Sequence, residues 1–145
     1  MTSLAEAFDL ARADHGLAIV STVRADYSIQ ATLVNAGIIA HPSTKQTVLG
    51  IVVAGRAKLA HLRARPQVSV AFRDGWRYAT VEGLAQIAGP DDPQPWLDAE
   101  GLRVLLRDIF TAAGGTHEDF EEYDRVMVEQ RRAAVLITPT RIYGG

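Results

Sequence analysis

The residues of this chain best suited to chemistry are two basic side chains, Arg56 and Lys58, which stand two positions apart. The pattern around them predicts a short helix over residues 56–64, and Pro66 ends it because proline cannot donate a backbone hydrogen bond. The first N–H groups of a helix have no partner inside the helix and carry partial positive charge. An arginine and a lysine at this end therefore predict a site for phosphate or carboxylate, the alternative being two exposed surface cations.

The charges along the chain are unevenly distributed. Residues 45–77 carry seven basic side chains against one acidic, whereas residues 90–125 carry ten acidic side chains against three basic. The first block predicts attraction of an anionic ligand, and the second predicts solvated charge on helices. Ordinary surface patterning is the alternative for both blocks. The net charge of −2 gives no overall attraction to nucleic acid, so we expect no nucleic-acid partner.

The sequence lacks the motifs of most enzymes that catalyse reactions with their own side chains. The chain has no cysteine, and it lacks a nucleophile elbow, a Walker run and a dinucleotide-binding glycine motif. No metal site is expected, because no two of its four histidines have ligand spacing: His15, His41, His61 and His117. We therefore expect no catalytic side chain, as in a redox enzyme whose bound coenzyme performs the chemistry. If a phenol supplies a proton, Tyr78 and Tyr143 are the candidates; solvent is the alternative.

The elements that must position the basic pair follow from hydrophobic periodicity and turn signals. We predict helices over residues 4–13, 56–64, 94–112 and 117–130. We predict strands over residues 17–23, 29–39, 47–53, 68–72, 76–87 and 133–138. The long fifth strand is expected to bulge at Gly83, and Pro139 is expected to end the last strand. Most of the strands are joined too tightly for parallel crossovers. The sequence thus predicts one α+β domain over residues 1–145, a six-stranded, mainly antiparallel small barrel with flanking helices.

The hydropathy pattern predicts neither a signal peptide nor a membrane span. The N-terminus lacks the basic start and apolar run of a signal peptide, and the apolar stretches have the length of strands. We therefore expect a cytoplasmic protein that does not enter a membrane.

Several segments, in order, resemble a known superfamily: residues 17–26, 55–58, 62–70, 78–85 and 131–144. Together they resemble the split β-barrel flavin-binding superfamily typified by pyridoxamine 5′-phosphate oxidase. The chain is most similar to its actinobacterial branch of flavin and deazaflavin oxidoreductases that use coenzyme F420. The resemblance implies a split β-barrel, a homodimer and two equivalent coenzyme sites in grooves between the subunits.

The resemblance also implies which residues bind the coenzyme. Its phosphate would meet the corner formed by Gly55, Arg56, Lys58 and Leu59. Its ring would lie along the second and third strands, at Gln30, Thr32, Val34, Asn35, Val52 and Ala54. The partner subunit would supply Trp76 or Arg77. From the residues alone, Asn35 fits a turn or bulge equally well, and Trp76 fits a dimer core equally well.

The activity implied is that of an oxidoreductase which transfers a hydride from reduced F420 to a small, conjugated organic acceptor. Two alternatives stay open: an FMN-dependent oxidase or reductase of the same fold, and a carrier that binds F420 or flavin without turnover. Residues 28–37 depart from the usual second-strand pattern of such families, so the resemblance implies no particular acceptor.

Overall fold

The computed structural model describes residues 3–145. The helices are α1 (Leu4–Arg12), α2 (Arg56–Ala64), α3 (Ala99–Ala112) and α4 (Phe120–Glu129). The strands are β1 (Leu17–Val23), β2 (Ile29–Asn35), β3 (Gly37–Ala40), β4 (Thr47–Val53), β5 (Gln67–Asp74), β6 (Arg77–Ala88) and β7 (Ala133–Gly144). In this part of the chain no helix has the length and apolar character needed to cross a membrane.

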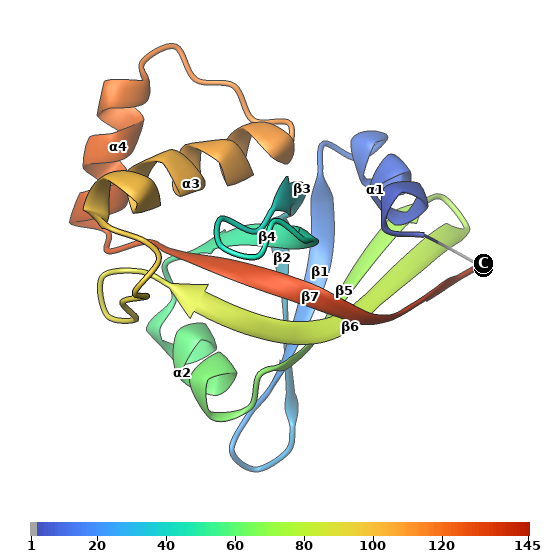
Figure 1. Cartoon of the computed structure of the whole chain (residues 1–145). Helices are drawn as coiled ribbons and strands as arrows, with labels where there is room; N and C mark the ends of the chain where they lie inside the picture. Colours follow the sequence, from blue (N-terminus) through green and yellow to red (C-terminus); the bar gives the residue numbers. More distant parts are fainter. Residues whose placement is uncertain (1–2) are drawn as a thin grey trace.

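The strands of residues 3–145 form one seven-stranded sheet in the order β2-β1-β5-β6-β7-β4-β3, and each neighbouring pair is antiparallel. The predicted α+β class and antiparallel sheet are therefore confirmed. Figure 1 shows α1 beside the β5–β6 hairpin, α2 at the opposite end of the sheet, and α3 with α4 over the end that carries β3 and β4. The first and last segments of the described chain lie close together there.

The strand count differs from the prediction of six because the predicted strand 29–39 is two strands. Ala36 interrupts it: its side chain is buried and its N–H donates to the Gly16 carbonyl at 3.0 Å. Before this point β2 pairs with β1, and after it β3 pairs with β4. One continuous run of β-forming residues thus serves two different parts of the sheet, which local pattern alone does not reveal.

The bulge predicted at Gly83 is confirmed, but the predicted end at Pro139 is wrong. The register between β6 and β7 shifts between Glu82 and Gly83, and Pro139 pairs with Gly83 at that shift. A Cβ on Gly83 would lie 2.4 Å from the Thr138 carbonyl oxygen, so only glycine fits there. A bulge tolerates the missing proline N–H, and β7 continues to Gly144.

The predicted helices 4–13 and 56–64 agree closely with α1 and α2, whereas the last two begin later than predicted. Residues 94 and 97 form an isolated β-bridge, and α3 begins only after Asp98, whose Oδ1 accepts from the Gly101 N–H at 2.7 Å. Asp119 likewise caps α4 by accepting from the N–H groups of Glu121 and Glu122. The cap residues, with their non-helical backbone, set both starts.

The hydrophobic core has two parts separated by the sheet. Alternate residues of β7 face each part, as its pleat requires. Val135 and Ile137 pack in the barrel interior with Phe8 of α1, while Leu136 packs beneath α3 and α4. The helical pair is thus fixed on the outside of the barrel, and this layer supplies one wall of the candidate site.

Candidate functional site

A cavity of about 510 Å³ opens where β2 and β4 end and α2 begins. We call it the basic cavity. Six of the predicted cofactor residues line it: Val34, Asn35, Val52, Ala54, Gly55 and Lys58. The remaining lining comes from His15, Leu33, Val53, Ile109, Phe110, Ala113, Gly114, Gly115, Tyr123, Met127 and Arg132. Its volume falls within the range of small-molecule sites, about 300–1,000 Å³.

The start of α2 presents free hydrogen-bond donors at this cavity. Gly55 is the N-cap and has no side chain that could accept from the first turn. The first bond within the helix runs from the Leu59 N–H to the Gly55 carbonyl at 3.1 Å. The N–H groups that precede Leu59 in the helix are therefore left for an outside acceptor, and the helix dipole adds partial positive charge.

Lys58 adds a full positive charge to this corner. Its side chain is half-buried, and this burial lowers the pKa of its ammonium group because the charged form loses solvent. No carboxylate of residues 3–145 offsets that cost, since no carboxylate belongs to the described lining of the cavity. An anionic ligand would restore the lost solvation energy of the charge.

A second cation, Arg132, lines the same cavity from the other side. It lies one residue before β7, and the antiparallel register that pairs Val53 with Ala133 brings it beside the end of β4. Its Nε donates to the Oε1 of Gln130 at 2.9 Å. The sequence analysis did not single out Arg132, because only the β4–β7 pairing joins these distant segments.

His15 also lines the cavity, although the sequence analysis considered it only as a metal ligand. Its backbone is in the left-handed region, with φ of 59°. Its carbonyl accepts from the Nδ2 of Asn35 at 2.9 Å, so the amide of Asn35 fixes the turn before β1 and leaves its Oδ1 for other contacts. The turn is packed against α3: a Cβ on Gly16 would lie 2.1 Å from the Ala113 carbonyl oxygen.

The remaining wall of the cavity is apolar and comes from α3 and α4. Ile109, Phe110, Met127 and Tyr123 form it. The Tyr123 hydroxyl donates to the Leu106 carbonyl at 3.1 Å, and burial raises the pKa of this phenol. Tyr123 therefore stays protonated and hydrogen-bonded within the protein, and it serves the cavity as an apolar surface.

Arg56 and Leu59 stand on α2 outside the cavity lining. Leu59 is buried in the barrel core. Arg56 is exposed and lies near Asp91. The pKa of the Asp91 carboxyl is lowered chiefly by its hydrogen bond with Arg131. The positive charges of Arg63 and Arg56 lower it further. Of the two predicted phosphate ligands, only Lys58 lines the basic cavity.

Gln30 and Thr32 lie on the same inward face of β2 as Val34, farther along the strand and outside the cavity lining. The register pairs Gln30 with Thr22 of β1. Three buried side-chain oxygens have no hydrogen-bond partner among the described residues: Thr22 Oγ1, Gln30 Oε1 and Thr32 Oγ1. These atoms form a small polar patch inside the barrel.

Trp76 and Arg77 lie at the β5–β6 turn, at the other end of β5 from α2 (Figure 1). Trp76 is fully exposed. The two phenols considered as proton donors also lie elsewhere: Tyr78 is an exposed residue at the start of β6, and the Tyr143 hydroxyl donates to Glu82 Oε2 at 3.3 Å. Within one subunit the structure does not bring any of these four residues to the cavity.

The outward face of the sheet carries large apolar side chains in solvent, and we call it the apolar sheet face. Ile19 of β1 pairs directly with Leu33 of β2, and Leu33 is 62% exposed. The face is made by Ile19, Ile29, Leu33 and Leu84. Large apolar side chains exposed on one face are typical of interaction sites.

No family model matches the chain. Solved structures do resemble it along nearly its whole length. A conserved hypothetical protein from Mycobacterium tuberculosis matches with a TM-score of 0.66 and 19% identity over 99% of this chain and 84% of that one. A structure titled F420 reductase matches with a TM-score of 0.60 and 19% identity over 88% of each chain. A pyridoxamine 5′-phosphate oxidase-related, FMN-binding protein from Nostoc punctiforme matches with a TM-score of 0.64 and 12% identity over 97% of this chain and 81% of that one.

These likenesses confirm the fold that the sequence resemblance implied. The chain has the split β-barrel fold of pyridoxamine 5′-phosphate oxidase-like proteins, with seven strands in its sheet. Proteins with this fold include an F420 reductase and an FMN-binding protein.

Proposed function

We propose that this protein is an oxidoreductase that binds coenzyme F420 in the basic cavity and transfers a hydride from its reduced form to a small, conjugated organic acceptor. The observation that carries the proposal is the pair of cations, Lys58 and Arg132, beside the free N–H groups of α2, in a cavity whose described lining has no carboxylate. A ligand with a phosphate and further negative charge fits this donor set. F420 has both, since a polyglutamate tail follows its phosphate.

Each lining residue would bind the part of the coenzyme that its own chemistry suits. Lys58 and the first turn of α2 would hold the phosphate through charge-assisted hydrogen bonds. Val34, Val52 and Ala54 would pack against the ring, and the apolar wall with Met127 would exclude water from it. The bound coenzyme itself supplies the hydride.

We also propose that the protein acts as a cytoplasmic homodimer joined through the apolar sheet face. Each subunit exposes the same face, which suits a two-fold symmetric interface. Trp76 and Arg77, which are remote from the cavity of their own subunit, would then be available to the cavity of the partner. Gln30 and Thr32, on the strand that ends at the cavity, would flank the ring in the completed site.

FMN is the second candidate ligand. One phosphate suffices for the corner formed by Gly55 and Lys58, and the Nostoc punctiforme protein with this fold is an FMN-binding protein. A carrier role is the third possibility. The one phenol in the cavity lining, Tyr123, is engaged with Leu106, so among the described lining residues no free hydroxyl acid faces a bound ligand.

Equilibrium titration with purified F420 and, separately, FMN tests the proposal. We expect saturable F420 binding, followed by oxidation of reduced F420 when quinones, biliverdin or unsaturated lactones are added. Absence of F420 binding at tens of micromolar would remove the proposal. FMN binding alone would favour the second candidate, and tight F420 binding without acceptor-dependent oxidation would favour the carrier.

A further inference from the structure

A second cavity, of about 400 Å³, lies between α3, α4 and the segment that joins β6 to α3. We call it the helical cavity. Gly89, Pro90, Pro93, Gln94 and Leu97 line it from the joining segment. Asp98, Ala99, Leu102, Arg103, Leu106, Asp124, Met127, Val128, Arg131 and Arg132 line it from the helices and from the turn before β7. It is separate from the basic cavity except at Met127 and Arg132, which line both.

The walls of the helical cavity are largely apolar. Leu102 and Leu106 of α3 face it, together with Met127 and Val128 of α4. Val128 is 75% exposed, so the mouth of the cavity carries an apolar side chain. The joining segment is held in place because the Gln94 side chain donates to the Ile87 carbonyl at 2.8 Å. A small, mostly apolar molecule, such as one with a ring system, suits a space of this volume and lining.

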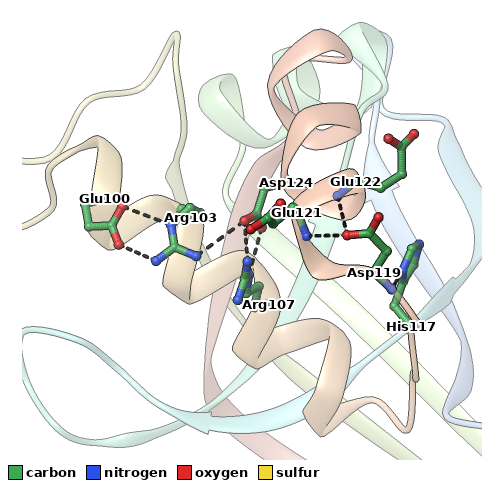
Figure 2. Close-up of polar contacts among 8 residues, drawn as sticks. All are labelled: Glu100, Arg103, Arg107, His117, Asp119, Glu121, Glu122 and Asp124. Carbon is green, nitrogen blue, oxygen red and sulfur yellow. Dashed lines mark hydrogen bonds and ion pairs between the residues drawn. The ribbon is translucent and has the colours of Figure 1, made fainter.

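Most charges around the helical cavity are neutralised by neighbours. Figure 2 shows Arg103 of α3 between Glu100 and Asp124, and Arg107 reaching the same Asp124 of α4. These contacts, above all those with Arg107, lower the pKa of the Asp124 carboxyl. Arg131 pairs with Asp91 at 2.5 Å. Asp98 is engaged as the cap of α3.

Arg132 is the exception. Its only side-chain hydrogen bond within residues 3–145 is the one from Nε to the neutral amide of Gln130, and no described carboxylate lies within ion-pair distance of it. Its side chain is half-buried. The terminal amino groups of this guanidinium therefore remain available in a space whose other walls are apolar, and a single anionic group would complement them.

We propose that the helical cavity is a second ligand-binding site, for a small, flat, mostly apolar molecule that carries one carboxylate or sulfonate, and that Arg132 binds this anionic group. The inference goes beyond the proposed function. The ligand pairs its rings with Leu102, Leu106 and Val128 and its anion with Arg132.

Anilinonaphthalene sulfonate is a suitable probe, because it joins an apolar ring system to one sulfonate and fluoresces when it leaves water. We expect saturable binding with one site per chain. Ala99→Trp and Val128→Trp change residues that line only the helical cavity, at exposed positions where a larger side chain does not disturb the core. Each should block the site sterically and abolish the saturable component. Unchanged binding in both variants would overturn the proposal, because the probe would then be bound elsewhere, for example on the apolar sheet face.

The role of Arg132 has its own test. Arg132→Gln should weaken sulfonate binding about 10- to 100-fold, the range expected for loss of a charge-assisted hydrogen bond. Arg125→Gln is the matched control: it lies on α4, pairs with Glu122 and Glu129, and lines neither cavity, so binding should not change. Phenylnaphthylamine, which has the rings without the sulfonate, should bind the wild type and Arg132→Gln equally. Equal sulfonate binding by Arg132→Gln and Arg125→Gln would contradict the role of Arg132.

Because Met127 and Arg132 line both cavities, the two sites are distinguished by variants of residues that line only one of them. Lys58→Ala alters only the basic cavity, so probe binding should persist in that variant. Ala99→Trp should in turn retain F420 binding. Retained probe binding without any F420 binding would remove the proposed function and leave this inference standing.

Discussion

At the scale of single residues, Lys58 is the side chain that most determines the electrostatics of the basic cavity. Burial lowers the pKa of its ammonium group, and no carboxylate in the described lining offsets the lost solvation. A surface lysine would be paired or fully solvated, whereas Lys58 is half-buried and has no ion-pair partner among the described residues. An anionic ligand would supply the missing counter-charge and so offset the desolvation of Lys58. We therefore expect binding to depend most on Lys58.

Lys58→Ala should weaken F420 binding about 10- to 100-fold while the fold survives, because one charge-assisted contact is lost. Isothermal titration calorimetry measures the change, and thermal unfolding verifies the fold. Lys45→Ala is the matched control, since Lys45 bonds only the Pro42 carbonyl and lines a different cavity. If Lys58→Ala binds F420 as tightly as the wild type does, Lys58 does not contribute to F420 binding.

The lowered pKa of Lys58 also predicts a pH dependence. The ammonium group binds an anion only while protonated, so affinity is full below the lowered pKa and falls as pH rises through it, at a pH below the ordinary 10.5. Lys58→Arg keeps its charge at all accessible pH values and should hold its affinity over the same range. Titrations at stepwise higher pH distinguish the two, with His15→Gln measured alongside because His15 lines the same cavity. Parallel pH profiles for wild type and Lys58→Arg would contradict the explanation.

At the scale of elements, α3 and α4 act as one unit that forms a wall of both cavities. Asp124 of α4 joins them by accepting from Arg107 Nε at 2.8 Å and from Arg103 (Figure 2). Its side chain is 17% exposed, so solvent screens the contact only partly. The Phe110 ring packs on Tyr123 with centroids 4.8 Å apart and adds an apolar contact between the helices.

Asp124→Asn should lower the melting temperature by a few degrees near neutral pH, because it removes the shared counter-charge of Arg103 and Arg107. The pKa of Asp124 is lowered in the folded state from its ordinary 3.8. Its stabilising contribution is therefore complete above that value and lost as pH falls through the folded pKa. Thermal unfolding at stepwise lower pH should show the wild-type advantage vanish in acid.

Glu122→Gln is the control for this element. Glu122 pairs with Arg125 on the same helix and both side chains are exposed, so the loss should be small. Equal destabilisation by Asp124→Asn and Glu122→Gln would show that the contact between the helices adds nothing beyond surface charge.

At the scale of the whole molecule, the proposed dimer would complete the site through the apolar sheet face. Leu33 stands on this face and also lines the basic cavity, so an interface there would adjoin the coenzyme. Leu33→Arg should therefore convert the proposed dimer into a monomer, because two guanidinium groups would be brought into an apolar interface. Analytical ultracentrifugation measures the change.

Val128→Arg provides the comparison for Leu33→Arg, because Val128 is equally apolar and exposed but lies on α4, away from the sheet face. It should leave the oligomeric state unchanged. A wild-type protein that sediments as a monomer would remove the dimer from the proposal and leave the basic cavity as a site within one subunit.

The sequence by itself determined the local parts of this protein. The corner from Gly55 to Lys58 and the antiparallel class follow from interactions within a few residues: an uncapped helix start, and connections too short for crossovers. Such features are encoded where they occur in the chain.

Only the tertiary structure decided how those parts meet. Arg132 joins Lys58 because β7 pairs with β4, and the run 29–39 divides because Ala36 bonds to Gly16. The continuation of β7 past Pro139 likewise depends on a partner distant in sequence, because Pro139 pairs with Gly83 of β6. The physical reason is that strand pairing and packing free energy between distant segments outweigh local propensity, and one sequence pattern is compatible with several such pairings.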